Sequence, residues 1–187
     1  GDPVLKRVAD DITKDYQDLD GLISNMFETM YKASGVGLAA PQIGESIRLF
    51  IVDASPFGED EDDPEAIKVK DFKEVFINAE IVDRAGENWL FQEGCLSIPN
   101  IREDVNREST IRIKYYDRDW NYQEKEFDGY AARIIQHEYD HIDGILFTDL
   151  LNPLKKRMLK RKLQDISQGA IDVNYKMKFP ALKLKKR

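Results

Sequence analysis

Apolar residues recur at helical spacing in three parts of the chain. Between residues 18 and 33 they fall about 3.6 positions apart, which predicts an amphipathic helix. Residues 151–167 repeat the pattern and predict a second helix near the C-terminus. A third helix is expected over residues 131–143, because Asp128 is a plausible N-cap before it and Gly144 a natural stop after it.

Strands are predicted where β-branched and aromatic residues alternate with polar ones. Residues 47–53 and 74–82 form two such runs, and residues 108–117 pair with 123–128 as a predicted hairpin. Residues 35–44, GVGLAAPQIG, contain three glycines and a proline, so we expect a buried or half-buried turn there. Helices and strands do not alternate regularly, which favours an α+β fold.

Two segments lack a clear regular pattern, and nothing in the sequence marks a domain boundary, so one domain over residues 1–187 is expected. The segment of about 56–70 carries six acidic residues between 59 and 65, which indicates a solvated or mobile loop. A calcium site is disfavoured there because the spacing lacks the glycine and the closing glutamate of an EF-hand loop. Residues 171–180 alternate enough for a strand or an extended arm.

The composition is that of an ordinary globular protein, with 42% hydrophobic and 34% charged residues. No run approaches the roughly 18 apolar residues of a membrane span, so a membrane protein is not expected. The first ten residues, GDPVLKRVAD, lack the basic head and apolar stretch of a secretory signal. A single cysteine excludes an internal disulfide and suits a reducing cytosol or organelle matrix.

Charge is distributed unevenly along the chain. Residues 154–187 carry 12 Lys/Arg against two Asp, whereas residues 1–153 carry 16 Lys/Arg against 33 Asp/Glu. The acidic body argues against general binding of nucleic acid, DNA included. The basic C-terminal helix and tail, about 151–187, could either meet a phosphate-rich partner or form a solvated helix that offsets the acidic body.

Both histidines of the chain lie in the motif QHEYDH. His137 and His141 are four residues apart on the third predicted helix, so both can offer a ring nitrogen to one metal ion. Glu138 sits beside them in the position of the general base of H-E-x-x-H metal hydrolases. The alternative is a surface helix that carries two histidines by chance, and this alternative is disfavoured because no other histidine exists.

The third ligand stays open on the residues alone. No third histidine exists and no glutamate follows Glu138, so a protease of the zincin type would need a downstream aspartate. The candidates are Asp143, Asp149, Asp165 and Asp172. The upstream candidate is Cys95, although a lone cysteine is more often a small buried hydrophobe. A non-catalytic protein with a structural metal would need a closed set of four ligands, the fourth being a carboxylate.

Three motifs, in their order and spacing, resemble the signatures of the peptide deformylases, metal amidases that remove the N-formyl group from new bacterial and organellar polypeptides. The motifs are GVGLAAPQIG, EGCLS and QHEYDH, and the resemblance extends to NMFETMY, REDVNR and LFTDLLNPLKKR. It implies a single catalytic domain of antiparallel sheets around a central metal-binding helix, followed by a C-terminal helix and extension. The acidic loop and the segment after Gly169 fall outside the common pattern.

The resemblance also implies a ligand set for one divalent metal ion. Cys95, His137 and His141 would hold the ion, with a water in the fourth position. The family's native ion is typically Fe(II), and zinc, nickel or cobalt can occupy the site, a range that a thiolate with two imidazoles allows. Glu138 would take the proton of the water and later pass it to the departing amine.

Further roles follow from the same resemblance. The side-chain amide of Gln42 and the backbone N–H of Leu96 would stabilise the oxyanion. The expected substrate-binding residues are three glycines that allow close approach of a peptide, three apolar residues that wall the methionine pocket, and an arginine near the peptide backbone: Gly35, Gly37 and Gly94; Val36, Leu38 and Ile134; and Arg102.

The implied partners are nascent polypeptides that begin with N-formyl-methionine. The basic tail predicts a contact with the RNA phosphates of the ribosome. Deletion of residues 170–187 is expected to leave the hydrolysis of a short formyl peptide unchanged, because the metal site lies upstream. We expect a monomer in the bacterial cytoplasm, in preference to an organelle matrix, with no membrane contact.

Overall fold

The structure is a computed structural model that describes residues 1–179. Its α-helices are α1 (Leu19–Lys32), α2 (Ala40–Ile43), α3 (Pro64–Ile67), α4 (Gly129–Ile142) and α5 (Pro153–Ser167). Its strands are β1 (Gly37–Ala39), β2 (Leu49–Asp53), β3 (Lys73–Cys95), β4 (Ile98–Tyr116) and β5 (Tyr122–Asp128). Short 3₁₀ helices span Pro3–Lys6, Ser55–Glu59 and Phe147–Asp149.

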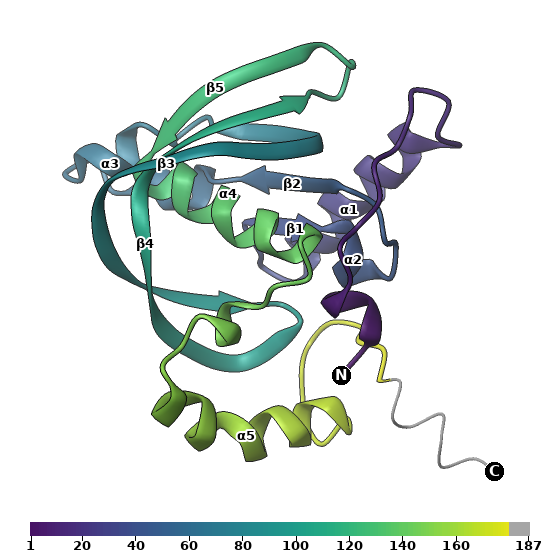
Figure 1. Ribbon diagram of the computed structural model, residues 1–187, viewed down its shortest axis with the longest axis vertical. Helices are drawn as coiled ribbons and strands as arrows, with labels where there is room; N and C mark the ends of the chain where they lie inside the picture. The colour runs from purple at the N-terminus through teal and green to yellow at the C-terminus, as the bar shows by residue number, and fades with distance from the viewer. Residues whose placement is uncertain (180–187) are drawn as a thin grey trace.

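The strands form one antiparallel sheet whose order follows the chain, β1-β2-β3-β4-β5. β3 and β4 are long and are joined by a tight turn at Leu96 and Ser97, where Cys95 pairs with Ile98. Their register shifts at four points, and such bulges bend a strand pair. The hairpin therefore curves around α4, as Figure 1 shows.

Helix α4 lies at the centre of the molecule. Its apolar residues belong to the largest cluster of buried residues, together with side chains from β1, β2, β3 and β4, and Phe127 of β5 packs against this cluster. A second cluster joins α1 to β1 and β2, and a third joins α5 to the first part of β4. In Figure 1, α5 lies beyond the far end of the β3–β4 hairpin, away from α1. The central helix is thus held by the whole sheet.

The α+β fold class and the three long helices are confirmed. The hairpin of β4 and β5 is also confirmed, with Tyr116 opposite Tyr122 at its turn. One open sheet is present, where several sheets were expected. The prediction was also wrong in ending one strand at residue 82 and beginning the next at 108, because β3 reaches Cys95 and β4 begins at Ile98. The bulges interrupt the strict alternation from which strands are predicted.

Two predicted loops have more structure than expected. Residues 35–44 contain β1 and one turn of helix, α2, whereas only a turn was predicted there. The acidic segment 56–70 is charged and largely exposed, but it carries α3 and is tied to the body. Tyr130 donates a hydrogen bond to the Asp63 carboxylate at 2.8 Å, and Lys68 lies 2.9 Å from the carboxylate of Asp128. The expectation of a purely solvated or mobile loop is therefore corrected.

Within residues 1–179, no helix is long and apolar enough to cross a membrane. Between the end of α5 and residue 179 the chain has no regular secondary structure, and residues 171–179 run back over the body (Figure 1). This agrees with the extended arm that the alternation predicted. The last basic residues of the predicted tail, 182–187, lie outside the described residues.

Candidate metal centre

Three ligand atoms meet where the β3–β4 turn reaches α4. Cys95 is the last residue of β3, and His137 and His141 lie one turn apart on α4. One ligand atom from each lies within 4.8 Å of the others, and Cys95 Sγ is 3.3 Å from His141 Nε2. Around a tetrahedral metal, bonds of about 2.3 Å to sulfur and 2.0–2.1 Å to nitrogen place such atoms about 3.6 Å apart. These residues therefore fit a divalent metal ion.

Within residues 1–179, no aspartate joins this cluster. Asp143 pairs with Arg48 at 2.7 Å, and Asp149 pairs with Lys6. The fold thus brings the upstream cysteine, and none of the candidate aspartates within residues 1–179, to the two histidines. A zincin site completed by a downstream aspartate does not match this geometry.

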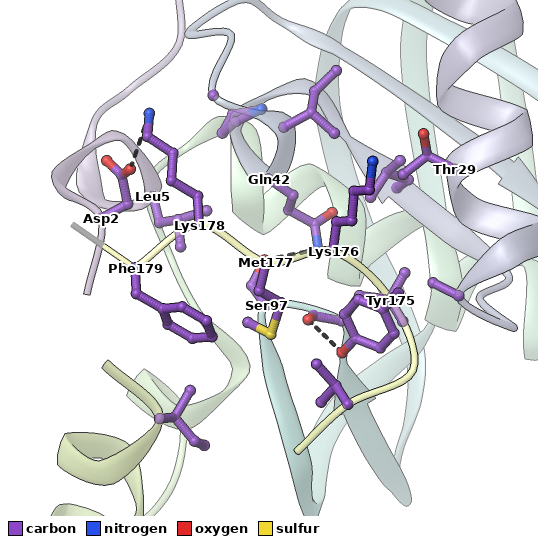
Figure 2. A pocket seen from close by; sticks show the side chains of 18 of the residues that line it. Asp2, Leu5, Thr29, Gln42, Ser97, Tyr175, Lys176, Met177, Lys178 and Phe179 are labelled. Carbon is purple, nitrogen blue, oxygen red and sulfur yellow. Dashed lines mark hydrogen bonds and ion pairs between the residues drawn. The ribbon is translucent and has the colours of Figure 1, made fainter. Parts of the chain in front are cut away.

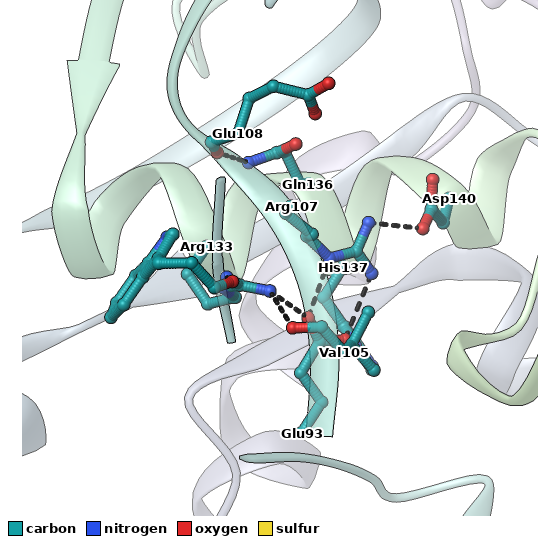
Figure 3. Close-up of polar contacts among 9 residues, drawn as sticks. Glu93, Val105, Arg107, Glu108, Arg133, Gln136, His137 and Asp140 are labelled. Atoms are coloured by element: carbon teal, nitrogen blue, oxygen red, sulfur yellow. Dashed lines mark hydrogen bonds and ion pairs between the residues drawn. The ribbon is translucent and has the colours of Figure 1, made fainter. Parts of the chain in front are cut away.

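Glu93 orients the first histidine ligand. Its carboxylate lies 2.9 Å from His137 Nδ1 (Figure 3). The pKa of Glu93 is held well below its ordinary value, since hydrogen bonds from His137 and Arg107 outweigh the effect of burial. An ionised carboxylate can only accept, so Nδ1 is the donor and Nε2 is the nitrogen left to bind a metal, which would displace any proton on it.

A buried network of charges holds Glu93 in place. Arg107 donates to both of its oxygens, at 2.7 and 3.0 Å, and Arg133 donates at 2.9 Å. Arg107 also bonds Asp140 at 2.7 Å (Figure 3), which links β3, β4 and α4 below the ligands. Glu93, Arg107, Arg133 and Asp140 are all buried. The charges of both signs bond one another and support the histidine, while the buried Nε atom of Arg133 has no hydrogen-bond partner within residues 1–179.

No role for these four residues was predicted from the sequence. One signal was present, because a ligating histidine almost always gives its second N–H to a carboxylate or carbonyl. That rule predicts an acidic residue, yet the chain has 35 Asp and Glu, and many of them precede the histidines. Only the folding of β3 along α4 selects Glu93.

Cys95 and His137 each shift the pKa of the other toward its charged form. Burial alone would raise the pKa of the Cys95 thiol, but His141 and His137 hold it well below its ordinary value. Burial alone would lower the pKa of His137, but Cys95 and Glu93 raise it well above that value. The sulfur is therefore a thiolate, the form that binds metals.

Glu138 lies in the same cluster but in a different electrostatic state. Burial raises its pKa to about 7, against the opposing effect of His137 and His141. Its Oε2 atom is buried and has no hydrogen-bond partner within residues 1–179. A carboxylate that titrates near neutral pH and keeps one oxygen free can accept and return a proton.

The glycine of β1 makes room for this glutamate. A Cβ placed on Gly37 would lie 2.4 Å from Glu138 Oε1 and 2.7 Å from its Cγ, far inside contact distance. Gly35 and Gly94 are also crowded, by the side chains of Leu96 and Arg102 respectively. The absence of a Cβ at these glycines thus leaves space for neighbouring side chains of the site. This packing role adds to the close approach of a peptide that was expected of them.

Gln42 points its amide nitrogen into the site. Its Oε1 accepts a hydrogen bond from the N–H of Ala39 at 2.7 Å, so the orientation of the amide is set by α2. Its Nε2 then lies 3.6 Å from Cys95 Sγ and 3.3 Å from Ser97 Oγ. A hydrogen-bond donor is thereby fixed beside the ligand cluster.

A cleft of about 650 Å³ opens on the ligands. It contains Cys95, His137 and Glu138 and most of the residues expected at the substrate: Gly35, Val36, Gly37, Gln42, Gly94, Leu96, Arg102 and Ile134. Leu38 is the exception, because it is 3% exposed, packs in the cluster with α1 and lines a different cavity. Its proposed place in the methionine pocket does not match this position.

The segment after Gly169 also reaches the site. Residues Asp172 to Tyr175 line the cleft, and the Tyr175 hydroxyl donates a hydrogen bond to the carbonyl of Leu96 at 2.8 Å (Figure 2). Deletion of residues 170–187 was expected to be neutral because the metal site lies upstream, but residues 172–175 line the cleft, so an upstream position does not by itself support that expectation. Distance along the sequence did not translate into distance in space.

Comparison with known proteins identifies relatives over nearly the whole chain. Residues 1–157 match the family described as polypeptide deformylase. A peptide deformylase of Christiangramia forsetii is 56% identical over 185 residues, covering 98% of this chain and 94% of that protein. One from Flavobacterium psychrophilum is 55% identical over 181 residues, covering 96% and 93%. The crystal structure of a peptide deformylase from Legionella pneumophila is 38% identical with a TM-score of 0.74, covering 92% and 95%.

Proposed function

The chain belongs to the polypeptide deformylase family and is a hydrolase that removes the formyl group from the N-terminal formyl-methionine of newly made polypeptides; we propose that it does so at the cluster of Cys95, His137 and His141. The observation that carries this assignment is the convergence of one thiolate and two imidazoles on one point, beside the free carboxylate oxygen of Glu138. Substrate carbonyl, nucleophile and proton acceptor can all meet in this cleft.

The metal is proposed to be Fe(II), with zinc, nickel or cobalt as ions that the same ligands can hold. When bound, the metal supplies a water of lowered pKa as the nucleophile for the formyl carbon. The protein's part is to hold the ligands in their coordinating forms. Glu93 does this for His137, and the two histidines do it for the Cys95 thiolate.

Glu138 is proposed as the proton carrier. Its pKa near 7 supports transfer of a proton from the attacking water to the carboxylate, as does its Oε2 atom, which has no hydrogen-bond partner in the described part of the chain. The same proton then passes to the nitrogen of methionine as the C–N bond of the formamide breaks. The products are formate and a peptide with a free N-terminal amine, and Glu138 returns to its starting state.

The oxyanion is proposed to form between two donors. The amide nitrogen of Gln42 is fixed beside Cys95, and the backbone N–H of Leu96 follows that residue in the β3–β4 turn. Each such donor is worth roughly 3 kcal/mol in the transition state. Val36 and Ile134 in the same cleft would contact the methionine side chain, and Arg102 the peptide backbone.

The experiment that tests this function combines metal analysis with an amidase assay. The unaltered protein should hydrolyse formyl-Met-Ala-Ser and leave acetyl-Met-Ala-Ser intact. Cys95→Ala should lose metal and activity together, whereas Glu138→Ala should keep stoichiometric metal and lose most of kcat. Full activity with stoichiometric metal in Cys95→Ala would overturn the ligand set, and normal turnover in Glu138→Ala would remove it from the mechanism.

A contact with the ribosome is proposed through α5. Five of its basic side chains are exposed and make no ion pair within residues 1–179: Lys156, Arg157, Lys160, Arg161 and Lys162. They carry positive charge on a protein whose net charge is −7, which supports local binding of RNA phosphates. The bacterial relatives support a cytoplasmic location for the enzyme, which we propose acts as a monomer.

A further inference from the structure

The segment after α5 crosses the entrance to the catalytic cleft. Gly169, with φ of +74°, turns the chain at the end of α5, and residues 171–179, here called the arm, run back beside α2 and the β3–β4 turn (Figure 2). Side chains at odd positions of the arm are partly buried and those at even positions are exposed. The buried set is Ile171, Val173, Tyr175, Met177 and Phe179. An extended segment with one apolar face toward the body has this alternation.

Tyr175 anchors the arm at the β3–β4 turn, Leu96 and Ser97, here called the catalytic turn. Its hydroxyl bonds the carbonyl of Leu96 at 2.8 Å, and Leu96 directly follows the ligand Cys95. A second and weaker anchor joins Lys178 to Asp2 at 4.0 Å near the N-terminus (Figure 2). Of these two contacts, the hydrogen bond of Tyr175 is the one at the site. Losing this bond would therefore release the arm where the substrate enters.

The arm forms a wall of the cleft and does not fill it. Residues Asp172 to Tyr175 line the same cleft as Glu138, yet that cleft keeps about 650 Å³ with the arm in place. Sites that hold ligands of this kind usually measure about 300–1,000 Å³. A second cavity of about 870 Å³ lies between the arm, α2 and the N-terminal 3₁₀ helix, and Tyr175, Leu96 and Gln42 border both spaces.

The substrate must pass this wall. Its formyl group has to reach Glu138 and Cys95 at the base of the cleft, and the residues that follow methionine must leave through the opening. Tyr175 lines this cleft, and an aromatic ring is a surface that buries apolar area at low entropic cost. The family model matches residues 1–157 and does not include the arm, whereas the peptide deformylase of Christiangramia forsetii aligns with this chain over 185 residues.

We propose that the arm is part of the substrate-binding cleft of this enzyme and that Tyr175 is a specificity-determining residue, which contacts the peptide beyond formyl-methionine. This inference rests on the proposed site. Turnover of formyl-Met-Ala-Ser by the unaltered protein tests that site by itself, and the comparison of substrate lengths in variants tests the arm.

The experiment compares formyl-Met-amide, which ends at methionine, with formyl-Met-Ala-Ser. Both are assayed with the full chain, Tyr175→Phe, Tyr175→Ala and a chain that ends after Gly169. For the tripeptide, Tyr175→Ala and the shortened chain should raise KM about 3- to 10-fold, the value of one aromatic contact, with kcat within twofold. Tyr175→Phe keeps the ring and loses the hydrogen bond to Leu96, so its KM should lie between those of the full chain and Tyr175→Ala. For formyl-Met-amide, all four proteins should agree within twofold.

The matched control is Tyr122→Phe, which removes the hydroxyl of an exposed tyrosine at the β4–β5 turn and should change neither substrate. Equal losses on both substrates would overturn the proposal, as would unchanged KM in every variant. A rise in kcat/KM on removing the arm would show that the arm obstructs the cleft. Loss of metal in Tyr175→Ala would show that it supports the metal site, and this too would refute a substrate contact.

Discussion

Replacing Gly37 by alanine should disable the enzyme by displacing Glu138. Gly37 lies in β1 and its φ is not positive, so alanine fits the backbone without strain. The added Cβ, however, would lie 2.4 Å from Glu138 Oε1, about 1 Å inside the ordinary contact limit of 3.4 Å. The Cγ and Cδ atoms of Glu138 also lie within 2.8 Å of this added Cβ, so the whole glutamate side chain must shift. A displacement of about 1 Å at a catalytic group can cost about 100-fold in rate.

The expected result is a loss of about 100-fold in kcat, or about 2.7 kcal/mol in the barrier, with metal content unchanged. Steady-state assays with formyl-Met-Ala-Ser and metal analysis of the purified variant would measure both. Thermal unfolding should change little, because the clash is with one side chain that can rotate within the cleft. The metal should stay because the Cys95 and histidine ligands are not touched.

A double-mutant cycle separates this effect from a general disturbance of β1. In the Glu138→Ala background the space beside residue 37 is empty, so adding Gly37→Ala should reduce the residual rate by less than about twofold. If Gly37→Ala keeps near-normal kcat, the steric reasoning fails. If it lowers the rate by the same factor with and without Glu138, the glycine acts on something other than the proton carrier.

Three further predictions address the rest of the site and α5. Glu93→Gln should weaken metal binding about 10- to 100-fold in competition with a chelator, because the amide cannot hold His137 as the carboxylate does; unchanged affinity would exclude that orienting role. Gln42→Leu should lower kcat about 100-fold with full metal content, through loss of an oxyanion donor, and a rise in KM alone would make Gln42 a binding residue. Reversing Lys160, Arg161 and Lys162 to glutamate should abolish salt-sensitive co-sedimentation with ribosomes and leave tripeptide hydrolysis intact; co-sedimentation indifferent to the change would leave α5 a packing and solubility element.

The sequence by itself determined the residue types of the site and most of the local structure. The spacing of His137 and His141 predicted two ligands on one helix face, and a helix of 3.6 residues per turn makes that inference independent of the rest of the fold. The three long helices and the β4–β5 hairpin followed from periodicity for the same reason, since both patterns are local. The choice of Cys95 over the aspartates, by contrast, came from the resemblance of motifs and was left open by the residues alone.

The tertiary structure decided which distant residues meet. The bulges of β3 bend the hairpin around α4, so the last part of β3 reaches this helix. The curvature places both Cys95 and Glu93 against the histidines. α4 is buried on polar as well as apolar sides, with Glu138 and Asp140 both at most 6% exposed. Hydrophobic patterning predicts the helix but does not reveal that these charged residues are buried, since their burial is stabilised by partners from other strands.

The arm shows most clearly which features the sequence determines and which only the tertiary structure decides. Its alternation of apolar and polar residues predicted an extended conformation, which the structure confirms. No local pattern gives the direction in which such a segment runs, because any apolar surface within reach of the end of α5 could cover its buried face. The bond from the Tyr175 hydroxyl to the Leu96 carbonyl joins residues 79 positions apart, and it brings the arm to the catalytic turn. Contacts of that sequence separation arise only from the packing of the completed fold.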